Sequence, residues 1–140
     1  MMKNLFQILC GLFLVVSYYS CMHSEEDKVD VLIIGGGASG VTSGIQSARM
    51  GANTLILEES TWLGGMLTSA GVSAVDGNYR LPAGLWGEFK NRLSDYYGGL
   101  DSLKTGWVSN VLFEPSVGNK ILHEMVAAEN NLRNCLNLIQ

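Results

Sequence analysis

Several residue types that define whole classes of protein are scarce in this chain. Its 140 residues include three cysteines, two histidines and two prolines. Three scattered cysteines are too few for the four thiolates of an iron–sulfur cluster, and no CxxC or His/Cys grouping offers a metal site. Nine Lys and Arg residues stand against 13 Asp and Glu residues without forming a basic patch, which argues against a nucleic-acid partner.

A long hydrophobic run is absent as well. A membrane-spanning helix needs about 20 consecutive apolar residues, and the apolar run at residues 5–16 is shorter and is interrupted by Gln7 and Gly11. A short apolar run after a positive N-terminal residue, here Lys3, is typical of a secretory signal peptide. We therefore expect residues 1–20 to be a signal peptide that takes no part in the fold.

The end of this segment resembles a bacterial lipoprotein signal. A small residue, Ser20, stands immediately before Cys21, and in such signals the cysteine becomes the acylated first residue of the mature chain. Tyr18 departs from the pattern, because an aliphatic residue is usual there. The prediction is an exported envelope protein, lipid-anchored at Cys21 through an acidic tether at residues 21–29. Ordinary cleavage near Ser20, giving a soluble periplasmic protein, and an uncleaved helical anchor are the alternatives.

The next segment has the pattern of a βαβ unit. Residues 31–34 are all aliphatic, which predicts a strand buried on both faces of a parallel sheet. Apolar residues then recur at spacings of three and four between residues 39 and 50, as in an amphipathic helix, and residues 54–57 form a second aliphatic run. The expected fold class is α/β, with a right-handed crossover between two parallel strands.

The turn between the first strand and the helix contains a dinucleotide-binding pattern. Three glycines fit G-x-G-x-x-G, in which the first permits a tight turn, the second lets a pyrophosphate approach the backbone and the third lets the helix pack close to the strand. The start of the helix presents unpaired N–H groups to the phosphates. The predicted phosphate-binding residues are Gly35, Gly36, Gly37, Ala38, Ser39 and Gly40.

Two further features extend this pattern. Glu58 stands at the end of the second strand, where an acidic side chain can accept hydrogen bonds from the hydroxyls of an adenosine ribose. Gly64, Gly65 and Met66 follow in a segment without helix or strand periodicity, which suggests that the chain returns along the same cofactor with bare backbone. NAD and FAD share the first half of such a site. The second glycine pair favours FAD and leaves NAD as the alternative.

Five stretches resemble FAD-dependent oxidoreductases with a glutathione-reductase-like Rossmann domain, and in particular the grouping of flavoproteins similar to heterodisulfide reductase. They are "DVLIIGGGASG", "LILEES", "WLGGMLTSAG", "LWGEFKNRL" and "FEPSVGNKILHEMV". The resemblance implies that the first glycine loop meets the FAD pyrophosphate, that Glu58 meets the ribose, and that Gly64, Gly65 and Met66 lie toward the flavin. It also implies hydride transfer between a small-molecule substrate and the flavin.

The rest of the chain predicts additional helices. Residues 81–97 form a helical pattern with Pro82 in its first turn and Gly98 at its end, a second helix begins at Pro115, and residues 132–139 suit a strand. Members of the resembled family are much longer. Residues 30–140 are therefore expected to be the N-terminal part of a Rossmann-like FAD-binding domain, or else an inert nucleotide-binding remnant or lipoprotein module. No residue is assigned a catalytic role.

Overall fold

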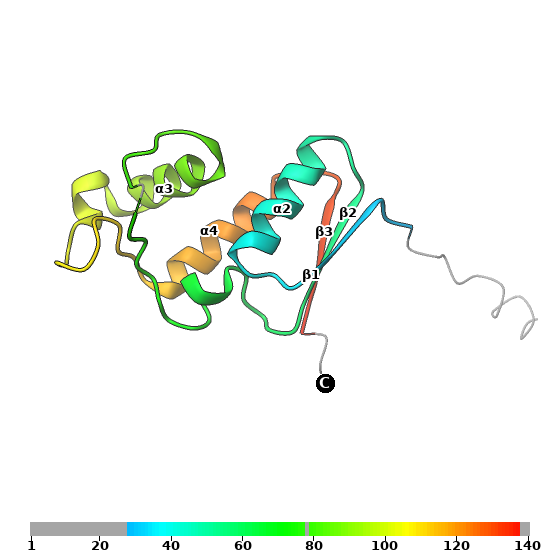
Figure 1. Ribbon diagram of the computed structural model, residues 1–140, viewed down its shortest axis with the longest axis horizontal. Helices are drawn as coiled ribbons and strands as arrows, with labels where there is room; N and C mark the ends of the chain where they lie inside the picture. The colour runs from blue at the N-terminus through cyan, green and yellow to red at the C-terminus, as the bar shows by residue number, and fades with distance from the viewer. Residues whose placement is uncertain (1–27, 78, 138–140) are drawn as a thin grey trace, which may run out of the picture.

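The computed structural model describes residues 28–77 and 79–137 (Figure 1). The predicted signal peptide, the lipidation site Cys21 and most of the predicted acidic tether lie outside these residues. Within the described part of the chain, no helix combines the length and apolar character needed to cross a membrane.

The predicted βαβ unit is present. Strand β1 (Val31–Ile34) leads through the glycine turn into helix α2 (Ala38–Arg49), and the chain returns as strand β2 (Thr54–Glu58). The two strands are parallel, with Ile33 beside Ile56 in the register. Gly51 follows the C-cap residue of α2, and its φ of +95° suits a residue without a side chain. These elements confirm the crossover expected from the hydrophobic periodicity.

A third strand completes the sheet of the described residues. Strand β3 (Leu132–Leu136) pairs in parallel with β2, so that the strand order is β1-β2-β3. The predicted strand at residues 132–139 is therefore present in its first part. Because all three strands run the same way, their carboxyl ends meet at one edge of the sheet, where parallel α/β proteins bind ligands.

Two helices cover one face of this sheet. Helix α2 packs on β1 and β2, and helix α4 (Pro115–Ala127), which begins at Pro115 as predicted, packs on β3 (Figure 1). Apolar side chains fill the layer between helices and strands and are at most 7% exposed: Ile45, Ile56, Met125 and Leu132. Burial of this layer is the main contribution to the stability of the described fold.

The other face of the sheet is bare in the described part of the chain. Leu32 is 53% exposed and Ile34 is 75% exposed. Side chains alternate between the two faces of a strand, and both covering helices lie on the same side. The expectation that residues 31–34 are buried on both faces is therefore wrong for the described structure, although the α/β class and the parallel sheet are as predicted.

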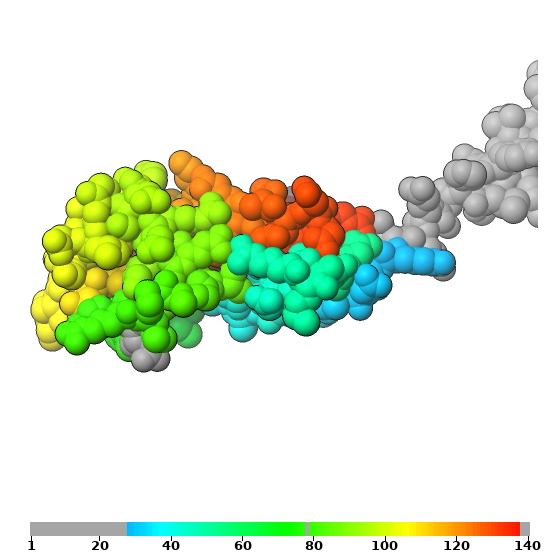
Figure 2. All heavy atoms as spheres, turned by 90° about the horizontal axis from the view of Figure 1, so that it is seen from above, coloured from blue at the N-terminus to red at the C-terminus, as the bar shows by residue number. Residues whose placement is uncertain are grey.

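Helix α3 (Gly84–Tyr97) and the short 3₁₀ helix η2 (Leu100–Leu103) form the end of the molecule away from the sheet (Figure 1). A second short 3₁₀ helix, η1 (Gly65–Leu67), lies beside α2. In the space-filling view of Figure 2, the green and yellow segment with α3 and η2 occupies one end, and β1 and α2 lie toward the other. Gly98, with a φ of +80°, ends α3 as predicted.

Helix α3 begins later than its sequence pattern indicates. Pro82 precedes the helix instead of lying in its first turn, and the helix starts at Gly84. The carbonyl group of Pro82 folds against the helix, so that a Cβ on Gly87 would lie 2.4 Å from its oxygen. This close contact lies at the start of the helix and leaves no sign in the periodicity.

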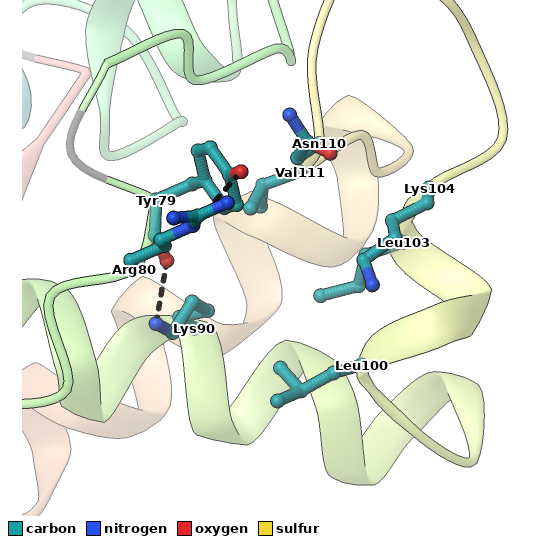
Figure 3. A pocket seen from close by; sticks show the side chains of 8 residues that line it. All are labelled: Tyr79, Arg80, Lys90, Leu100, Leu103, Lys104, Asn110 and Val111. Carbon is teal, nitrogen blue, oxygen red and sulfur yellow. Dashed lines mark hydrogen bonds between the residues drawn. The ribbon is translucent and has the colours of Figure 1, made fainter.

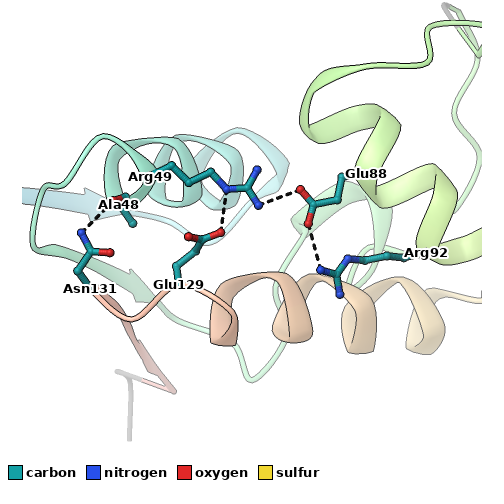
Figure 4. A network of polar contacts seen from close by, with 6 residues as sticks. All are labelled: Ala48, Arg49, Glu88, Arg92, Glu129 and Asn131. Carbon is teal, nitrogen blue, oxygen red and sulfur yellow. Dashed lines mark hydrogen bonds and ion pairs between the residues drawn. The ribbon is translucent and has the colours of Figure 1, made fainter.

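A network of charged side chains joins α2, α3 and the segment that follows α4 (Figure 4). Arg49, at the end of α2, donates from Nε to Glu129 Oε1 and from Nη2 to Glu88 Oε2, each over 2.8 Å. Arg92 donates to the second oxygen of Glu88 over 3.1 Å. The hydrogen bonds that Arg49 donates to Glu129 and Glu88 raise the pKa of its guanidinium above the ordinary value. The network fixes α3 beside the crossover helix.

Candidate dinucleotide-binding site

The first glycine loop lies where β1 ends and α2 begins. Gly35 has a φ of +98°, which favours glycine, and its N–H donates to the carbonyl of Leu57 over 2.7 Å. The loop therefore continues the pairing of β1 with β2 before it turns into the helix. Gly37 is the N-cap residue of α2, and no side chain caps the helix there. The first-turn N–H groups of α2 have no partner within the helix.

Gly37 has no structural reason to be a glycine. Its φ is −62°, which any residue adopts, and a Cβ built on it would meet no heavy atom within 4 Å. The space where a Gly37 side chain would begin is therefore open. Backbone N–H groups and the positive end of the helix dipole face such a space at a helix start, which favours an anion there.

Gly40 is a glycine for the opposite reason. A Cβ on this residue would lie 1.9 Å from the carbonyl oxygen of Gly35 and 3.4 Å from a side-chain carbon of Ile33. The first turn of α2 thus packs directly on the end of β1, as expected for the third glycine of the pattern. This packing holds the first turn of the helix close to the loop.

Glu58 lies beside the glycine loop, at the end of β2. Its Oε2 accepts a hydrogen bond from the N–H of Gly36, and its Oε1 accepts one from the N–H of Ser60 over 2.9 Å. Partial burial acts to raise the pKa of the Glu58 carboxyl, but the hydrogen bonds from Ser60 and Gly36 outweigh it and hold the pKa below its ordinary value. Glu58 is therefore ionised near neutral pH.

The bond to Gly36 adds a role that the sequence pattern did not indicate. Through this bond Glu58 ties the end of β2 to the first glycine loop. An ionised carboxylate offers about four acceptor positions. The N–H groups of Gly36 and Ser60 bond to different oxygens of this carboxylate and hold it toward the loop.

The second glycine pair returns to the first loop, as the sequence predicted. Gly64 donates from its N–H to the carbonyl of Gly36 over 2.7 Å and forms a parallel bridge with Gly37. A Cβ on Gly65 would lie 3.1 Å from the Cα of Gly37. Gly64 and Gly65 also have φ values of +107° and +54°, which favour glycine. Two segments of bare backbone thus lie side by side at the carboxyl edge of the sheet.

Sequence reasoning missed the side chains that hold the second glycine pair in place. Leu63 donates from its N–H to Asn119 Oδ1 over 2.9 Å, and its carbonyl accepts from the hydroxyl of Thr68 over 2.6 Å. Asn119 comes from α4, one turn before the buried Leu122. The sequence did carry a signal for this contact, because Asn119 is a polar residue on the apolar side of the helix predicted to begin at Pro115.

An apolar pocket of about 270 Å³ opens beside the first turn of α2. Met66, which the resemblance placed toward the flavin, is 68% exposed in η1. Its neighbour Leu67 lines the pocket. Helices α2, α3 and α4 all contribute to the walls, which include Ser39, Thr42, Trp86, Phe89 and Met125.

The described residues contain no group of three or more His, Cys, Asp or Glu side chains placed to hold a metal ion. Cys135 is a free, exposed thiol on β3. The site consists of backbone amides, one carboxylate and an adjoining apolar wall. Such a set of groups can bind a nucleotide diphosphate and a ribose, and it contains no evident nucleophile or general base.

Comparison with known proteins agrees with a site made of these groups. A sequence model of the family described as FAD dependent oxidoreductase matches residues 30–139. No curated protein sequence gave a significant match.

Solved structures similar to the chain include THI4 from Thermovibrio ammonificans, at 18% identity and a TM-score of 0.43, which covers 91% of this chain and 45% of that one. Another is p-nitrophenol 4-monooxygenase PnpA from Pseudomonas putida, at 13% identity and a TM-score of 0.41, which covers 76% of this chain and 31% of that one. A third is 3-ketosteroid-delta4-(5alpha)-dehydrogenase from Rhodococcus jostii, at 34% identity and a TM-score of 0.28, which covers 41% of this chain and 11% of that one.

The chain thus spans less than half the length of each of these structures. The family model, by contrast, matches most of the chain and includes both glycine loops and Glu58. The chain belongs to the FAD-dependent oxidoreductase family.

Proposed function

We propose that residues 30–137 bind the ADP portion of FAD at the carboxyl edge of the sheet and serve as the FAD-binding part of an oxidoreductase. The pyrophosphate lies against Gly35, Gly37 and the first turn of α2, and the adenosine ribose lies at Glu58. The observation that carries this proposal is the open space at Gly37, where the backbone tolerates a side chain and none is present.

The second glycine loop supports FAD over NAD. Gly64 and Gly65 lie against the first loop through backbone contacts, which adds a second segment of bare backbone beside the first. Met66 and Leu67 continue this strip toward the apolar pocket beside α2. We place the flavin side of the cofactor along Gly64, Gly65 and Met66.

FAD, when bound, supplies the redox chemistry, which we propose is hydride transfer with a small-molecule substrate. The residues of this chain bind and orient the cofactor. The amides at the start of α2 hold the negative pyrophosphate, and the ionised Glu58 accepts hydrogen bonds from the ribose. Trp86 and Phe89 contribute apolar walls beside the first turn of α2.

The test is a titration of the full-length chain with FAD, followed by the quenching of flavin fluorescence. We expect FAD to bind and ADP to displace it, because the proposed contacts lie on the ADP half. Riboflavin, which lacks this half, should not displace FAD. Tighter binding of NAD than of FAD would contradict the assignment of the cofactor, and displacement by riboflavin but not by ADP would contradict the assignment of the site.

We further propose that the protein is exported and attached to the cell envelope by a lipid at Cys21. Support for this comes from the sequence of residues 1–29 alone. Cells that express the chain and are fed an alkyne fatty acid should incorporate the label into the protein, and a Cys21→Ala variant should lose it. Variants Cys10→Ala and Cys135→Ala are controls that should keep the label. Labelling that persists in the Cys21→Ala variant contradicts the anchor.

A further inference from the structure

A second pocket, of about 240 Å³, lies at the end of the molecule away from the glycine loops (Figure 3). Its walls come from α3, from η2, and from the segments that precede α3 and α4. Tyr79 and Arg80 lie on one side and Leu103 and Lys104 lie opposite them. None of the residues that line it belongs to the proposed FAD site or to the apolar pocket beside α2.

The most unusual residue of this pocket is Lys90, which is only 7% exposed. Its Nζ donates to the carbonyls of Tyr79 and Leu81 over 2.7 and 2.8 Å. It also lies 5.9 Å from the centre of the Trp86 ring. Among the ion pairs of the described residues, none gives Lys90 a carboxylate partner. A buried charge is normally paired with an opposite charge, because burial removes its hydration.

Two more cations face the same pocket. Arg80 donates from Nε to the Tyr79 hydroxyl over 3.1 Å, and its guanidinium lies 5.4 Å from the centre of the Tyr79 ring. Lys104 pairs with Asp101 over 2.8 Å. Within the described part of the chain, Arg80, like Lys90, has no ion pair with a carboxylate. Three cations therefore surround the pocket and one carboxylate balances them, which leaves an excess of positive charge.

Apolar side chains complete the lining. Leu103 and Val111 are almost fully buried, at 1% and 3% exposure, and Leu100 lies beside them. The side-chain amide of Asn110 adds a neutral hydrogen-bonding group at the rim. A strongly hydrated ion such as phosphate gains nothing from apolar walls. A carboxylate on a carbon skeleton matches both the cations and the apolar side.

We propose that this pocket binds a small carboxylate ligand with an apolar body, held by Arg80 and Lys90 and packed on Leu100, Leu103 and Val111. The inference goes beyond the proposed binding of FAD, since it concerns a separate pocket and a different ligand. Arg80 is the residue to vary, because it is exposed and its planar guanidinium suits a bidentate carboxylate contact. Lys90 also holds the backbone of Tyr79 and Leu81, so that its replacement would disturb the fold.

The experiment is isothermal titration calorimetry of the full-length chain with benzoate, with its neutral isostere benzamide and with inorganic phosphate. We expect benzoate to bind and benzamide not to bind. The Arg80→Gln variant should bind benzoate about tenfold more weakly, or worse, as expected for the loss of a hydrogen bond between charged groups. A Lys120→Gln variant, which removes an exposed cation from α4, is the matched control and should bind benzoate as the native protein does.

Three results overturn the proposal. In the first, the Arg80→Gln variant binds benzoate as tightly as the native protein does. In the second, the native protein binds neither benzoate nor phosphate. In the third, it binds phosphate more tightly than benzoate. The last result identifies an oxyanion site instead of a carboxylate site. FAD titrations of the same variants separate this proposal from the proposed function, because Arg80→Gln should leave FAD binding unchanged. If neither the native protein nor the variants bind FAD but the native protein binds benzoate, the result counts against the proposed FAD site and not against this pocket.

Discussion

A Gly37→Asp variant is expected to fold as stably as the native chain and to lose FAD binding. Gly37 is the N-cap residue of α2, with an extended backbone and open space for a side chain. Aspartate is a favoured N-cap residue, because its carboxylate accepts hydrogen bonds from the first-turn N–H groups, and it stabilises a helix by a few tenths of a kcal/mol relative to glycine. The added carboxylate would occupy the place proposed for the pyrophosphate.

Like charges brought together in a binding site cost several kcal/mol, so that FAD affinity should fall by roughly 100-fold or more. Thermal unfolding and flavin fluorescence, measured on the same samples, separate the two effects. Gly77→Asp is the matched control, since Gly77 also has open space for a Cβ and lies in a different segment. FAD binding that survives in the Gly37→Asp variant would refute the proposed pyrophosphate position.

A Gly40→Ala variant is expected to be strongly destabilised. Replacement of glycine by alanine inside a helix normally stabilises it by about 1 kcal/mol. Here the new methyl group would lie 1.9 Å from the carbonyl oxygen of Gly35, which is backbone and cannot rotate away. The helix must move off the end of β1. Overpacking costs about 1–3 kcal/mol, and a collision with backbone belongs at the upper end of this range. With the gain of about 1 kcal/mol in helix propensity subtracted, the expected net loss is about 2 kcal/mol.

Urea unfolding followed by circular dichroism measures this loss, and two variants of the same helix calibrate it. Gly44→Ala would bring a Cβ within 2.6 Å of Ile56 Cδ1, which is the end of a flexible side chain, so that the loss should be smaller. Ser43→Ala changes an exposed position and should alter the free energy of unfolding by no more than about 0.5 kcal/mol. A Gly40→Ala variant as stable as Ser43→Ala would contradict the close packing of α2 on β1.

The two variants separate glycines that look alike in the motif. Gly40 is required by the fold, because a side chain there would collide with the backbone of the preceding loop. Gly37 is not required by the fold, and its missing side chain leaves room for a ligand. A spacing pattern cannot distinguish these reasons, whereas the distance from a Cβ to its nearest neighbour can.

Most of the secondary structure follows from patterns that are local in the sequence. The crossover from β1 to β2, the start of α4 at Pro115 and the end of α3 at Gly98 were all predictable from periodicity, proline and glycine. The start of α3 was not, because the helix begins at Gly84, later than the apolar pattern does, and the pattern does not reveal the close contact of Pro82 with Gly87. Burial of β1 on one face only was also missed, since an aliphatic run does not reveal which side the helices cover.

The amino-acid sequence by itself determined the α/β class, the membership of a flavoprotein family and the glycines and carboxylate of the candidate site, because each depends on the types and spacing of neighbouring residues. Only the tertiary structure decided that Glu58 bonds to Gly36 and that Asn119 holds the second glycine loop against the first. The same is true of the cations gathered around Lys90. These contacts join residues far apart in the chain, and the packing of the helices on the sheet and on one another brings them within reach.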